Sequence, residues 1–539
     1  MQIKKDNQFL IWVGLIIHRN HYLYRIKNMS MKTRFTFCIL MLIPCINLFA
    51  QHFSNPVIAG DCADPTVIRV GKTYYASGTS SEWAPHYPIF KSTDLINWDY
   101  VCPAFQTNPE WTKASFWAPE LFELNGKIYL YYTARRASDG VSYIGVATTN
   151  NIEKGFTDHG CLVEFGREAI DAFVFEDEGK LYISWKAYGL DERPIELLCS
   201  EMSADGLQLV GEPFMLLRDD DNIGMEGQYM FKDRGYYYII YSIRGCCGAR
   251  SNYAVSVARS KSFKGPYEYY SMNPILQGDG TDVLSGGHGT AVKTPEGKLY
   301  YLYHAYLKGE GFYNGRQSFI KEMEINSDNW PVFVTGNLAS IKEPMPATKI
   351  KQKSVPNFHD NFKGKTIRPE WIWNFTFSDV KAEVKNKQLY LTGKSKDNNK
   401  YGAALCVRTL KPNYEVIAEV KDQQAITTGL TLYGDKDNLV IFGKENGELV
   451  LKQIRRGEER VLYNSHIKGN IALKIVVSGG NTASYSFSTD NKIWTPLENL
   501  EKQNVSYLPP WDRAFRPGLI HVGNENTPAE YKYFKLTYK

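Results

Sequence analysis

The chain has 539 residues, of which 22% are charged and 43% hydrophobic. This composition excludes a disordered protein, and the length leaves room for roughly two to four domains. The formal net charge is +5, from 63 Lys and Arg against 58 Asp and Glu, so where this charge lies decides whether a polyanion is a plausible partner. Aromatic residues make up 14% and favour strands, and their flat rings can stack on sugars or bases.

The excess positive charge lies in residues 1–50. This segment holds seven basic residues and one acidic residue, and the remainder has 56 basic and 57 acidic residues, so we expect no nucleic-acid partner. A basic stretch, Met31–Arg34, precedes the apolar run Phe35–Ala50. That is the layout of a secretory signal peptide, so residues 1–50 are expected to be a leader that starts near Met31. We expect a secreted or periplasmic protein with no stable membrane span, because Pro44 interrupts a run shorter than the ~20 residues that a span needs.

Cysteine usage predicts neither a disulfide scaffold nor a zinc site. Seven of the nine cysteines follow the leader and are scattered, and no CxxC pair occurs. For the adjacent Cys246 and Cys247 we expect packing or a bond to a distant cysteine rather than catalysis.

A repeat organises residues 51–345. A glycine turn followed by an aromatic strand recurs five times, 53 to 62 residues apart, as Gly71-KTYYASGT, Gly126-KIYLYYTAR, Gly179-KLYISWKAY, Gly235-YYYIIYSIR and Gly297-KLYYLYHAY. A strand-like segment precedes each glycine and another follows each aromatic strand, which predicts hairpins. Repeats of ~50 residues built from antiparallel strands are typical of a β-propeller. We therefore predict a five-bladed propeller, all-β, over residues 51–345.

A second domain follows a linker. Residues 346–357 gather Pro and Lys, as linkers do, and residues 358–539 are again rich in strands but lack the repeat. Alternating segments separated by Asp, Asn and Gly predict a jelly-roll (concanavalin-like) β-sandwich.

Ionisable residues stand at matching places in the five repeats. Six to nine residues before the repeat glycines lie Asp64, Glu120, Asp171, Glu226 and His288. The first strand of each blade lines the propeller axis, so this shared register predicts one cluster at one mouth of the channel.

Such a cluster suits the hydrolysis of glycosidic bonds. Carboxylates gathered near one axis repel one another, so one can stay protonated while another is ionised. An acid that protonates the leaving oxygen and a base that activates water need that difference. Nearby aromatic residues that can stack on sugar faces are Trp83, Trp117, Phe173 and Tyr229. Core packing between blades is the alternative for each, and we expect it for Phe173 more than for Trp83.

The region from about Asn55 to Pro344 resembles glycoside hydrolase family 43. The segments that carry the resemblance are Asn55-PVIAGDCADPTVIRV, Ile89-FKSTDLINW, Ile170-DAFVFEDEGKLY, Met225-EGQYMFKDRGYYYIIYS and Gly286-GHGTAV. Residues 358–539, with Asp360-NF and Phe487-STDNKIW, resemble the accessory sandwich of xylosidase-type members. The resemblance implies a five-bladed propeller and an inverting glycosidase.

The resemblance also implies roles for single residues. Asp64 matches the general base, Glu226 the general acid, and Asp171 the carboxylate that tunes the pKa of the acid and orients the substrate. Arg316 matches an arginine of the sugar subsite, and we expect Glu120 to bind substrate as well. His288 matches a histidine that holds a calcium ion near the axis through water. We expect that no cofactor is required and that this structural calcium is the one candidate metal.

We therefore expect a secreted, monomeric, inverting hydrolase that releases sugars from plant cell-wall polysaccharide side chains. An exo-acting α-L-arabinofuranosidase is the leading hypothesis. A β-xylosidase or an exo-β-galactanase on the same scaffold is the first alternative. A carbohydrate-binding propeller without catalysis is the second, and it needs the aromatic residues but not three carboxylates in register.

Overall fold

The described part of the chain is built almost entirely of strands. The computed structural model describes residues 51–539 except 189–193, 348–349 and 511–513, so the predicted leader lies outside it. Within these residues the helices are two short 3₁₀ turns, η1 (Ile152–Lys154) and η2 (Gly309–Asn314). None of the described helices is long and apolar enough to cross a membrane. The prediction of an all-β protein is confirmed.

The N-terminal region forms successive antiparallel sheets, each made of neighbouring strands of the chain, although the first sheet skips β4 (Trp83–Ala84). In the described residues there are five. They are β2(Thr66–Val70)-β3(Thr73–Ser77)-β5(His86–Ser92)-β6(Asp99–Phe105), β7(Thr112–Leu124)-β8(Lys127–Arg136)-β9(Ser142–Thr149)-β10(Thr157–Val163), β11(Glu168–Asp177)-β12(Lys180–Tyr188)-β13(Glu196–Met202)-β14(Phe214–Arg218), β15(Met225–Asp233)-β16(Tyr236–Ile243)-β17(Ala254–Ser260)-β18(Glu268–Tyr269) with β19(Leu276–Gln277) beside β17, and β20(Val283–Lys293)-β21(Leu299–Leu307)-β22(Gln317–Ile325)-β23(Pro331–Phe333).

The repeat glycines make the first hairpin of the sheets. At the β7–β8 turn, Asn125 and Gly126 have φ values of 52° and 78°. Two successive residues in the left-handed region form the turn whose twist matches a two-residue hairpin, and Asn-Gly suits it best. The turn therefore fixes the register in which Leu124 pairs with Lys127, and with it the side of the strand that faces the axis.

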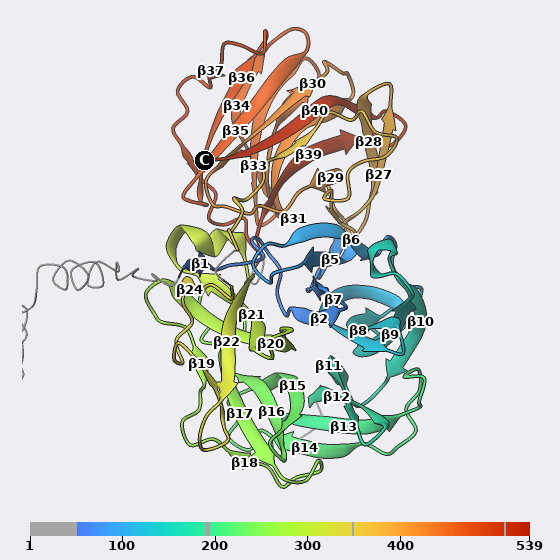
Figure 1. Cartoon of the computed structure of the whole chain (residues 1–539). Helices are drawn as coiled ribbons and strands as arrows, with labels where there is room; N and C mark the ends of the chain where they lie inside the picture. The colour runs from blue at the N-terminus through green and yellow to red at the C-terminus, as the bar shows by residue number, and fades with distance from the viewer. Residues whose placement is uncertain (1–50, 189–193, 348–349, 511–513) are drawn as a thin grey trace, which may run out of the picture. The chain divides into compact units, whose positions relative to one another are not determined.

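The five sheets close into a ring, as expected of a propeller. The first strands contact one another in the order β2, β7, β11, β15, β20 and back to β2, and they surround a common centre (Figure 1). A short strand ahead of the first sheet, β1 (His52–Ser54), pairs with β24 (Lys342–Pro344), which follows the last sheet. The Asn55 side chain hydrogen-bonds both the N–H and the carbonyl of Ile320 in β22. These bonds join the two ends of the repeat region.

The C-terminal region is a sandwich of two antiparallel sheets, which confirms the second predicted fold. One sheet has the order β27(Ser378–Lys385)-β28(Gln388–Ser395)-β40(Ala529–Tyr538)-β30(Tyr414–Val420)-β35(Ile471–Ser478)-β36(Thr482–Ser488)-β37(Thr495–Pro496), with β25(Phe358–Asp360) beside β40 and β38(Gln503–Asn504) beside β36. The other has the order β29(Ala403–Cys406)-β39(Arg516–Gly523)-β31(Ile426–Asp435)-β32(Asn438–Glu445)-β33(Glu448–Arg455)-β34(Glu458–His466). Buried residues of both, such as Val416 and Phe534 in the first and Leu430 and Phe442 in the second, form one core.

A buried ion pair joins the two regions. Arg516 of β39 donates to Asp61, 3.1 Å away, and the two side chains are 3% and 1% exposed. The Arg516 guanidinium also lies 3.9 Å from the ring centre of Trp83. Trp83 belongs to β4 (Trp83–Ala84), which pairs with β26 (Trp373–Asn374). Since Asp61 precedes Asp64 by three residues, this contact anchors the segment that carries the predicted base.

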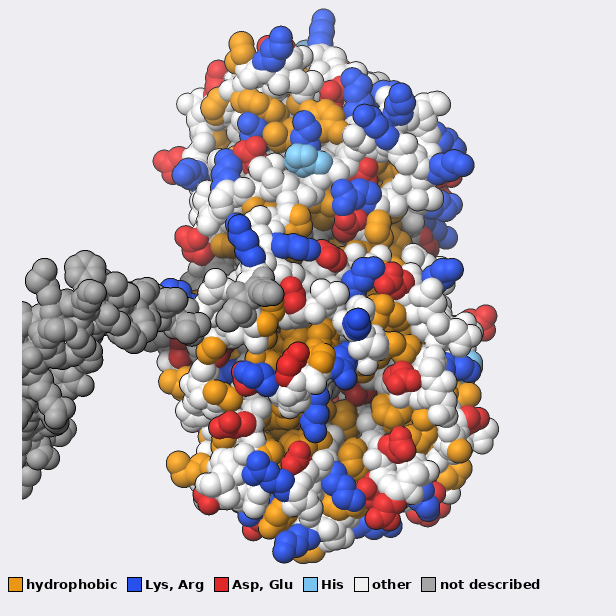
Figure 2. Space-filling model, viewed as in Figure 1, with side chains coloured by type: hydrophobic (Ala, Val, Ile, Leu, Met, Phe, Trp, Pro, Cys, Tyr) orange, Lys and Arg blue, Asp and Glu red, His pale blue; other side chains and the backbone are white. Residues whose placement is uncertain are grey.

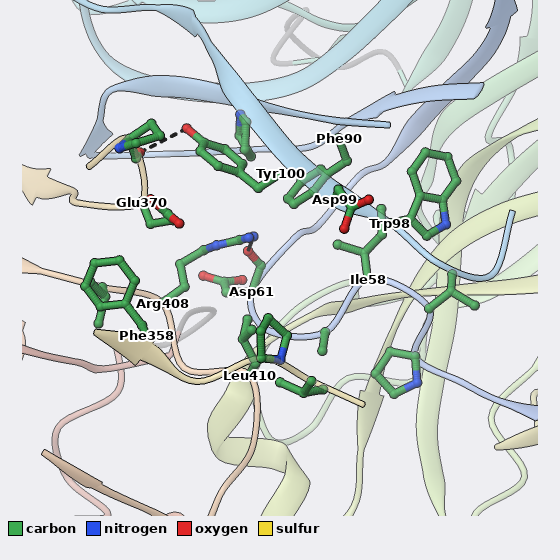
Figure 3. A pocket seen from close by; sticks show the side chains of 18 of the residues that line it. Ile58, Asp61, Phe90, Trp98, Asp99, Tyr100, Phe358, Glu370, Arg408 and Leu410 are labelled. Atoms are coloured by element: carbon green, nitrogen blue, oxygen red, sulfur yellow. Dashed lines mark hydrogen bonds between the residues drawn. The ribbon is translucent and has the colours of Figure 1, made fainter. Parts of the chain in front are cut away.

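A cavity of about 470 Å³ lies beside this contact, lined from both regions. In Figure 3, Arg408 and Asp61 point toward each other across it, and Arg408 Nη1 donates to the Asp61 carbonyl at 3.2 Å. None of the predicted catalytic carboxylates lines this cavity.

The structure bears on the sequence-based expectations about surface charge and about Cys246 and Cys247. On the face shown in Figure 2, basic and acidic side chains are interspersed and do not form one basic patch. Cys246 and Cys247 form a disulfide with each other. The expectation of packing or a distant partner was wrong, because no other cysteine of the described residues is bonded.

We expect Arg516→Ala to lower the free energy of unfolding by about 3–5 kcal/mol, because it leaves the Asp61 carboxylate buried without its charge partner. Urea unfolding followed by tryptophan fluorescence measures the loss. Lys353→Ala is the control, since the Lys353–Asp99 pair is 67% and 65% exposed and should contribute at most ~1 kcal/mol. Equal effects of the two substitutions would contradict the anchoring role.

Candidate active site

In each of the five sheets a residue in the left-handed backbone region stands in the first strand or just before it. The φ values are 50° at Asp64, 38° at Ala118, 60° at Asp171, 59° at Gly227 and 39° at His288. In β7, β11, β15 and β20 the strand pairing skips register at this point. A bulge of this kind turns a side chain out of the regular alternation, and two of the residues turned here are Asp171 and His288. Asp64 lies just before β2.

These left-handed residues are held by a ring of hydrogen bonds between sheets. The backbone N–H of each one donates to a side chain of the preceding sheet, at 2.7–3.2 Å. The pairs are Asp64 with His304 Nδ1, Ala118 with Thr79 Oγ1, Asp171 with Thr133 Oγ1, Gly227 with Asp171 Oδ2, and His288 with Ser242 Oγ. A strained backbone at a site persists only when its surroundings fix it, and this ring does so.

At position 227 there is also a steric reason for glycine. A Cβ atom there would lie 2.6 Å from the His288 ring, so no other residue fits at this point of the ring. The close approach brings the β15 backbone against His288 and leaves the preceding residue, Glu226, at the axis mouth.

Asp64 is surrounded by positive and polar groups. Its Oδ1 atom lies 3.2 Å from Arg316 Nη1, 3.2 Å from His304 Nδ1 and 3.5 Å from His288 Nδ1, and Thr79 donates to Oδ2 at 2.6 Å. Burial raises the pKa of Asp64, but the opposing effects, of which that of Arg316 is the largest, outweigh burial and hold this pKa well below the usual range. Asp64 is therefore ionised at neutral and mildly acidic pH.

Asp171 has the opposite electrostatics. Burial and the neighbouring Glu226 carboxylate raise the pKa of Asp171 to about 6, against the opposing effects of His288 and Lys186. His288 Nδ1 lies 3.8 Å from Asp171 Oδ2. Asp171 and Asp64 therefore differ in protonation over the range between their two pKa values.

Glu226 receives two hydrogen bonds. Lys186 Nζ donates to Oε2 at 2.5 Å and the Tyr253 hydroxyl donates to Oε1 at 2.8 Å. Burial raises the pKa of Glu226, but Lys186 and Tyr253 outweigh burial and lower it. The sequence-based hypothesis had Asp171 keep Glu226 protonated; in this structure, without substrate, the raised pKa belongs to Asp171. The reason is Lys186, which the sequence analysis did not include.

Three predicted substrate-binding residues lie one layer deeper along the axis. Glu120 pairs with Tyr131 past the bulge of β7, in the same register as Phe173 opposite Ser184 and Tyr229 opposite Ile240. Glu120 accepts a hydrogen bond from Thr66 at 2.8 Å, and burial raises its pKa to about 8. The prediction that Glu120 lies in the same register as the other ionisable residues was wrong. The distance to the repeat glycine varies from six to nine residues, and this range spans more than one pleat of the strand.

The aromatic predictions divide in the same way. Phe173 and Tyr229 pack edge to face with ring centres 5.1 Å apart, which is core packing. Trp83 is 3% exposed and covered by Arg516 and Tyr433 of the sandwich, so its ring does not face a sugar. Trp117 is half-buried, with Nε1 donating to Ser81 Oγ at 2.9 Å, and occupies the β7 position that corresponds to Glu226 in β15.

Several site residues were missed in the sequence, and three of them share one signal. His304, Lys186 and Thr133, like Ser242, are the seventh residue after a repeat glycine. The aromatic strand ends there with a polar residue that faces the axis. Comparing the repeats at this position, as was done for the preceding strand, would have found them. Thr79 and Tyr253 lie in loops and carry no such pattern.

The described residues contain no group of three or more His, Cys, Asp or Glu side chains placed to hold a metal ion. His288 Nδ1 faces the carboxylates of Asp64 and Asp171. No direct ligand set is therefore assigned to the calcium ion, and binding of the ion through water stays a prediction.

Family models match both regions of the chain. Residues 53–331 match the model of Glycosyl hydrolases family 43, and residues 359–537 match the Beta xylosidase C-terminal Concanavalin A-like domain. A β-xylosidase of Bacillus subtilis strain 168 is 27% identical over 379 residues, which is 64% of this chain and 67% of the relative. An extracellular exo-α-(1→5)-L-arabinofuranosidase of Cellvibrio japonicus is 27% identical over 304 residues, or 50% of this chain and 86% of that enzyme.

A third relative matches over a smaller share of its length. A xylan 1,3-β-xylosidase of Vibrio is 28% identical over 326 residues, which is 54% of this chain and 59% of the relative. Among solved structures, a family 43 protein of Bacillus licheniformis covers 91% of this chain and 100% of its own, with a TM-score of 0.76 and 21% identity. A Bacteroides ovatus protein described as xyloglucan PUL GH43B gives a TM-score of 0.77 at 19% identity, with the same coverage. These two structures support the fold alone.

We expect a carboxyl group to titrate near pH 6 in the free protein, since burial and Glu226 raise the pKa of Asp171 to about 6. Carbon-13 NMR of aspartate-labelled protein measures it. The signal should vanish in Asp171→Asn and remain in Asp205→Asn, a turn residue bonded to Ser203. Absence of any aspartate that titrates between pH 5 and 7 would contradict this arrangement.

Proposed function

Because the chain belongs to glycosyl hydrolases family 43, we propose that it is an inverting glycosidase, and that it acts as an exo-α-L-arabinofuranosidase on plant polysaccharide side chains. The observation that carries the proposal is the unlike environment of carboxylates at one axis mouth. Asp64 is held ionised chiefly by Arg316, whereas Asp171 beside Glu226 has a pKa raised to about 6. Acid and base catalysis on one glycosidic bond needs such a difference.

In this mechanism Asp64 is the general base. Its carboxylate takes a proton from a water molecule as the water oxygen bonds to the anomeric carbon. Arg316 keeps the carboxylate ionised, and Thr79 fixes its orientation through Oδ2. An ionised, oriented carboxylate is what a base that acts in a single displacement needs.

Glu226 is the general acid. It gives its proton to the glycosidic oxygen as the bond from that oxygen to the anomeric carbon breaks, and becomes a carboxylate. Lys186 and Tyr253 already bond this carboxylate, so the product state of the proton transfer is stabilised. Asp171 is placed to hold a proton beside Glu226 and to fix the β15 backbone, since its Oδ2 accepts from the Gly227 N–H at 3.2 Å.

Arg316 and Trp117 are the proposed sugar contacts. Arg316 lies beside Asp64, and Trp117 is half-buried at the mouth end of β7. Trp83, Phe173, Tyr229 and Glu120 are left out of the sugar site, because the structure buries them in the sandwich contact or one layer down the axis.

A β-xylosidase is the second candidate. It is favoured by the match of residues 359–537 to the β-xylosidase C-terminal domain and by the β-xylosidase relative. Secretion, the monomeric state and the plant-wall substrate remain parts of the proposal. Extracellular relatives such as the arabinofuranosidase of Cellvibrio japonicus support secretion.

We expect Glu226→Gln and Asp64→Asn each to lower kcat by ~10²–10⁴-fold, because each removes one proton-transfer group. Hydrolysis of an aryl α-L-arabinofuranoside measures the loss, and circular dichroism tests whether the fold is kept. Glu153→Gln, a change at an exposed pair with Lys91, is the control and should leave kcat unchanged. NMR of the first product should show the β-anomer. Near-normal turnover in either variant, or a retained configuration, would contradict the assignment.

A comparison of sugar release separates the two candidate substrates. With aryl glycosides of α-L-arabinofuranose, β-D-xylose and β-D-galactose at equal concentration, we expect the arabinoside to have the highest kcat/KM. A kcat/KM for the xyloside at least as high would favour the β-xylosidase instead. Release of single arabinose units from arabinan, without shorter chains, tests the exo action.

A further inference from the structure

We propose that Lys186 is a positioning residue for the general acid: its ammonium group fixes the Glu226 carboxyl group and sets the pH above which turnover stops. The inference deepens the proposed function and rests on the assignment of Glu226 as the acid. It starts from the place of Lys186 in the ring of sheets.

Lys186 stands where three of the four other sheets place a hydrogen-bond acceptor. The corresponding residues Thr133, Ser242 and His304 each accept the backbone N–H of the left-handed residue in the next sheet. A lysine ammonium has no acceptor, so it cannot hold the N–H of Gly227. That N–H donates to Asp171 Oδ2 instead, at 3.2 Å. A residue that only holds the ring together would therefore be Ser, Thr or His at this position.

The ammonium group is directed at the acid. Lys186 Nζ lies 2.5 Å from Glu226 Oε2, and the two side chains are 11% and 18% exposed. Burial of a lysine is costly, and a buried ion pair is weak evidence for stability. Burial lowers the pKa of Lys186, but Glu226 and Asp171 outweigh burial and raise it, so the ammonium stays charged.

Groups from every neighbouring element act on Glu226. They are Lys186 on β12, Asp171 on β11, Tyr253 just ahead of β17 and His288 on β20. Beyond them, Asp64 acts on Tyr253 and Glu168 acts on Lys186. Burial raises the pKa of Glu226, and the effects of Lys186, Tyr253 and His288 together outweigh burial. Among the effects that lower this pKa, that of Lys186 is the largest.

The sign of the effect on activity follows. The acid must be protonated to work, so kcat/KM falls as pH rises through the pKa of the acid, and a lower pKa moves this fall to lower pH. The Asp171–Glu226 pair loses its protons in coupled steps, with the pKa of Asp171 raised to about 6. We therefore expect the wild-type kcat/KM to decline above about pH 6. The base Asp64 stays ionised below this range, so it does not limit activity there.

The test is the pH profile of kcat/KM for the variant Lys186→Met. This substitution removes the positive charge and keeps a side chain of similar length. We expect the alkaline limb to move up by ~1–3 pH units, the size of effect that one neighbouring charge produces. Lys186→Arg keeps the charge and should keep the limb near its wild-type position. The control is Lys180→Met, on the same strand β12 but in an exposed pair with Glu201, and it should leave the profile unchanged.

A readout independent of turnover completes the test. Carbon-13 NMR of glutamate-labelled protein should show the Glu226 carboxyl, identified by its loss in Glu226→Gln, titrating at higher pH in Lys186→Met than in the wild type. Lower kcat/KM at every pH with an unmoved limb and an unmoved Glu226 titration would overturn the proposal. If Glu226→Gln keeps its turnover, the proposed function fails, whatever the NMR titration shows.

Discussion

The ring of hydrogen bonds between neighbouring sheets is the constraint on which the site depends. A backbone N–H in the left-handed region is satisfied in each case by a side chain of the sheet before it. Left-handed backbone at residues other than glycine costs ~1–3 kcal/mol each and persists only where the surroundings fix it. Because the ring runs through all five sheets, the positions of Asp64, Asp171 and His288 are tied to its closure. The join of β1 with β24 therefore matters to a site far from it in sequence.

The ring also distributes charge. At four of its positions the acceptor is a neutral side chain, and next to Asp64 it is His304, whose pKa burial lowers to about 4. At the fifth position, Lys186 stands in place of the acceptor and binds Glu226. The backbone N–H of Gly227 donates to Asp171 instead. The presence of a lysine at this one position thus brings together the proposed acid Glu226, its neighbour Asp171 and the Lys186 ammonium group. The base at the far side of the mouth keeps its own cation, Arg316.

Much of this organisation could be predicted from the repeat. The glycine turns and aromatic strands indicated the propeller, and comparison of the repeats found Asp64, Asp171, Glu226 and His288. Comparison failed at Glu120, because bulges change the count between the turn and the mouth, and the sequence does not show where a strand bulges. The prediction for Trp83 was wrong for another reason: in the sequence, a tryptophan looks the same whether it faces a sugar or the Arg516 of another domain.

By itself, the sequence determined the periodic features of this protein: the strands, their turns, the change of fold after residue 345, and the ionisable residues that recur with the repeat. Each is a local property, set by alternation, turn geometry and spacing along the chain. Only the tertiary structure decided which side chains meet. The pairs Lys186 with Glu226, His304 with Asp64 and Arg516 with Asp61 join residues 40, 240 and 455 positions apart. The protonation states at the site follow from these contacts, because a pKa depends on burial and on the charges nearby, neither of which spacing in sequence records.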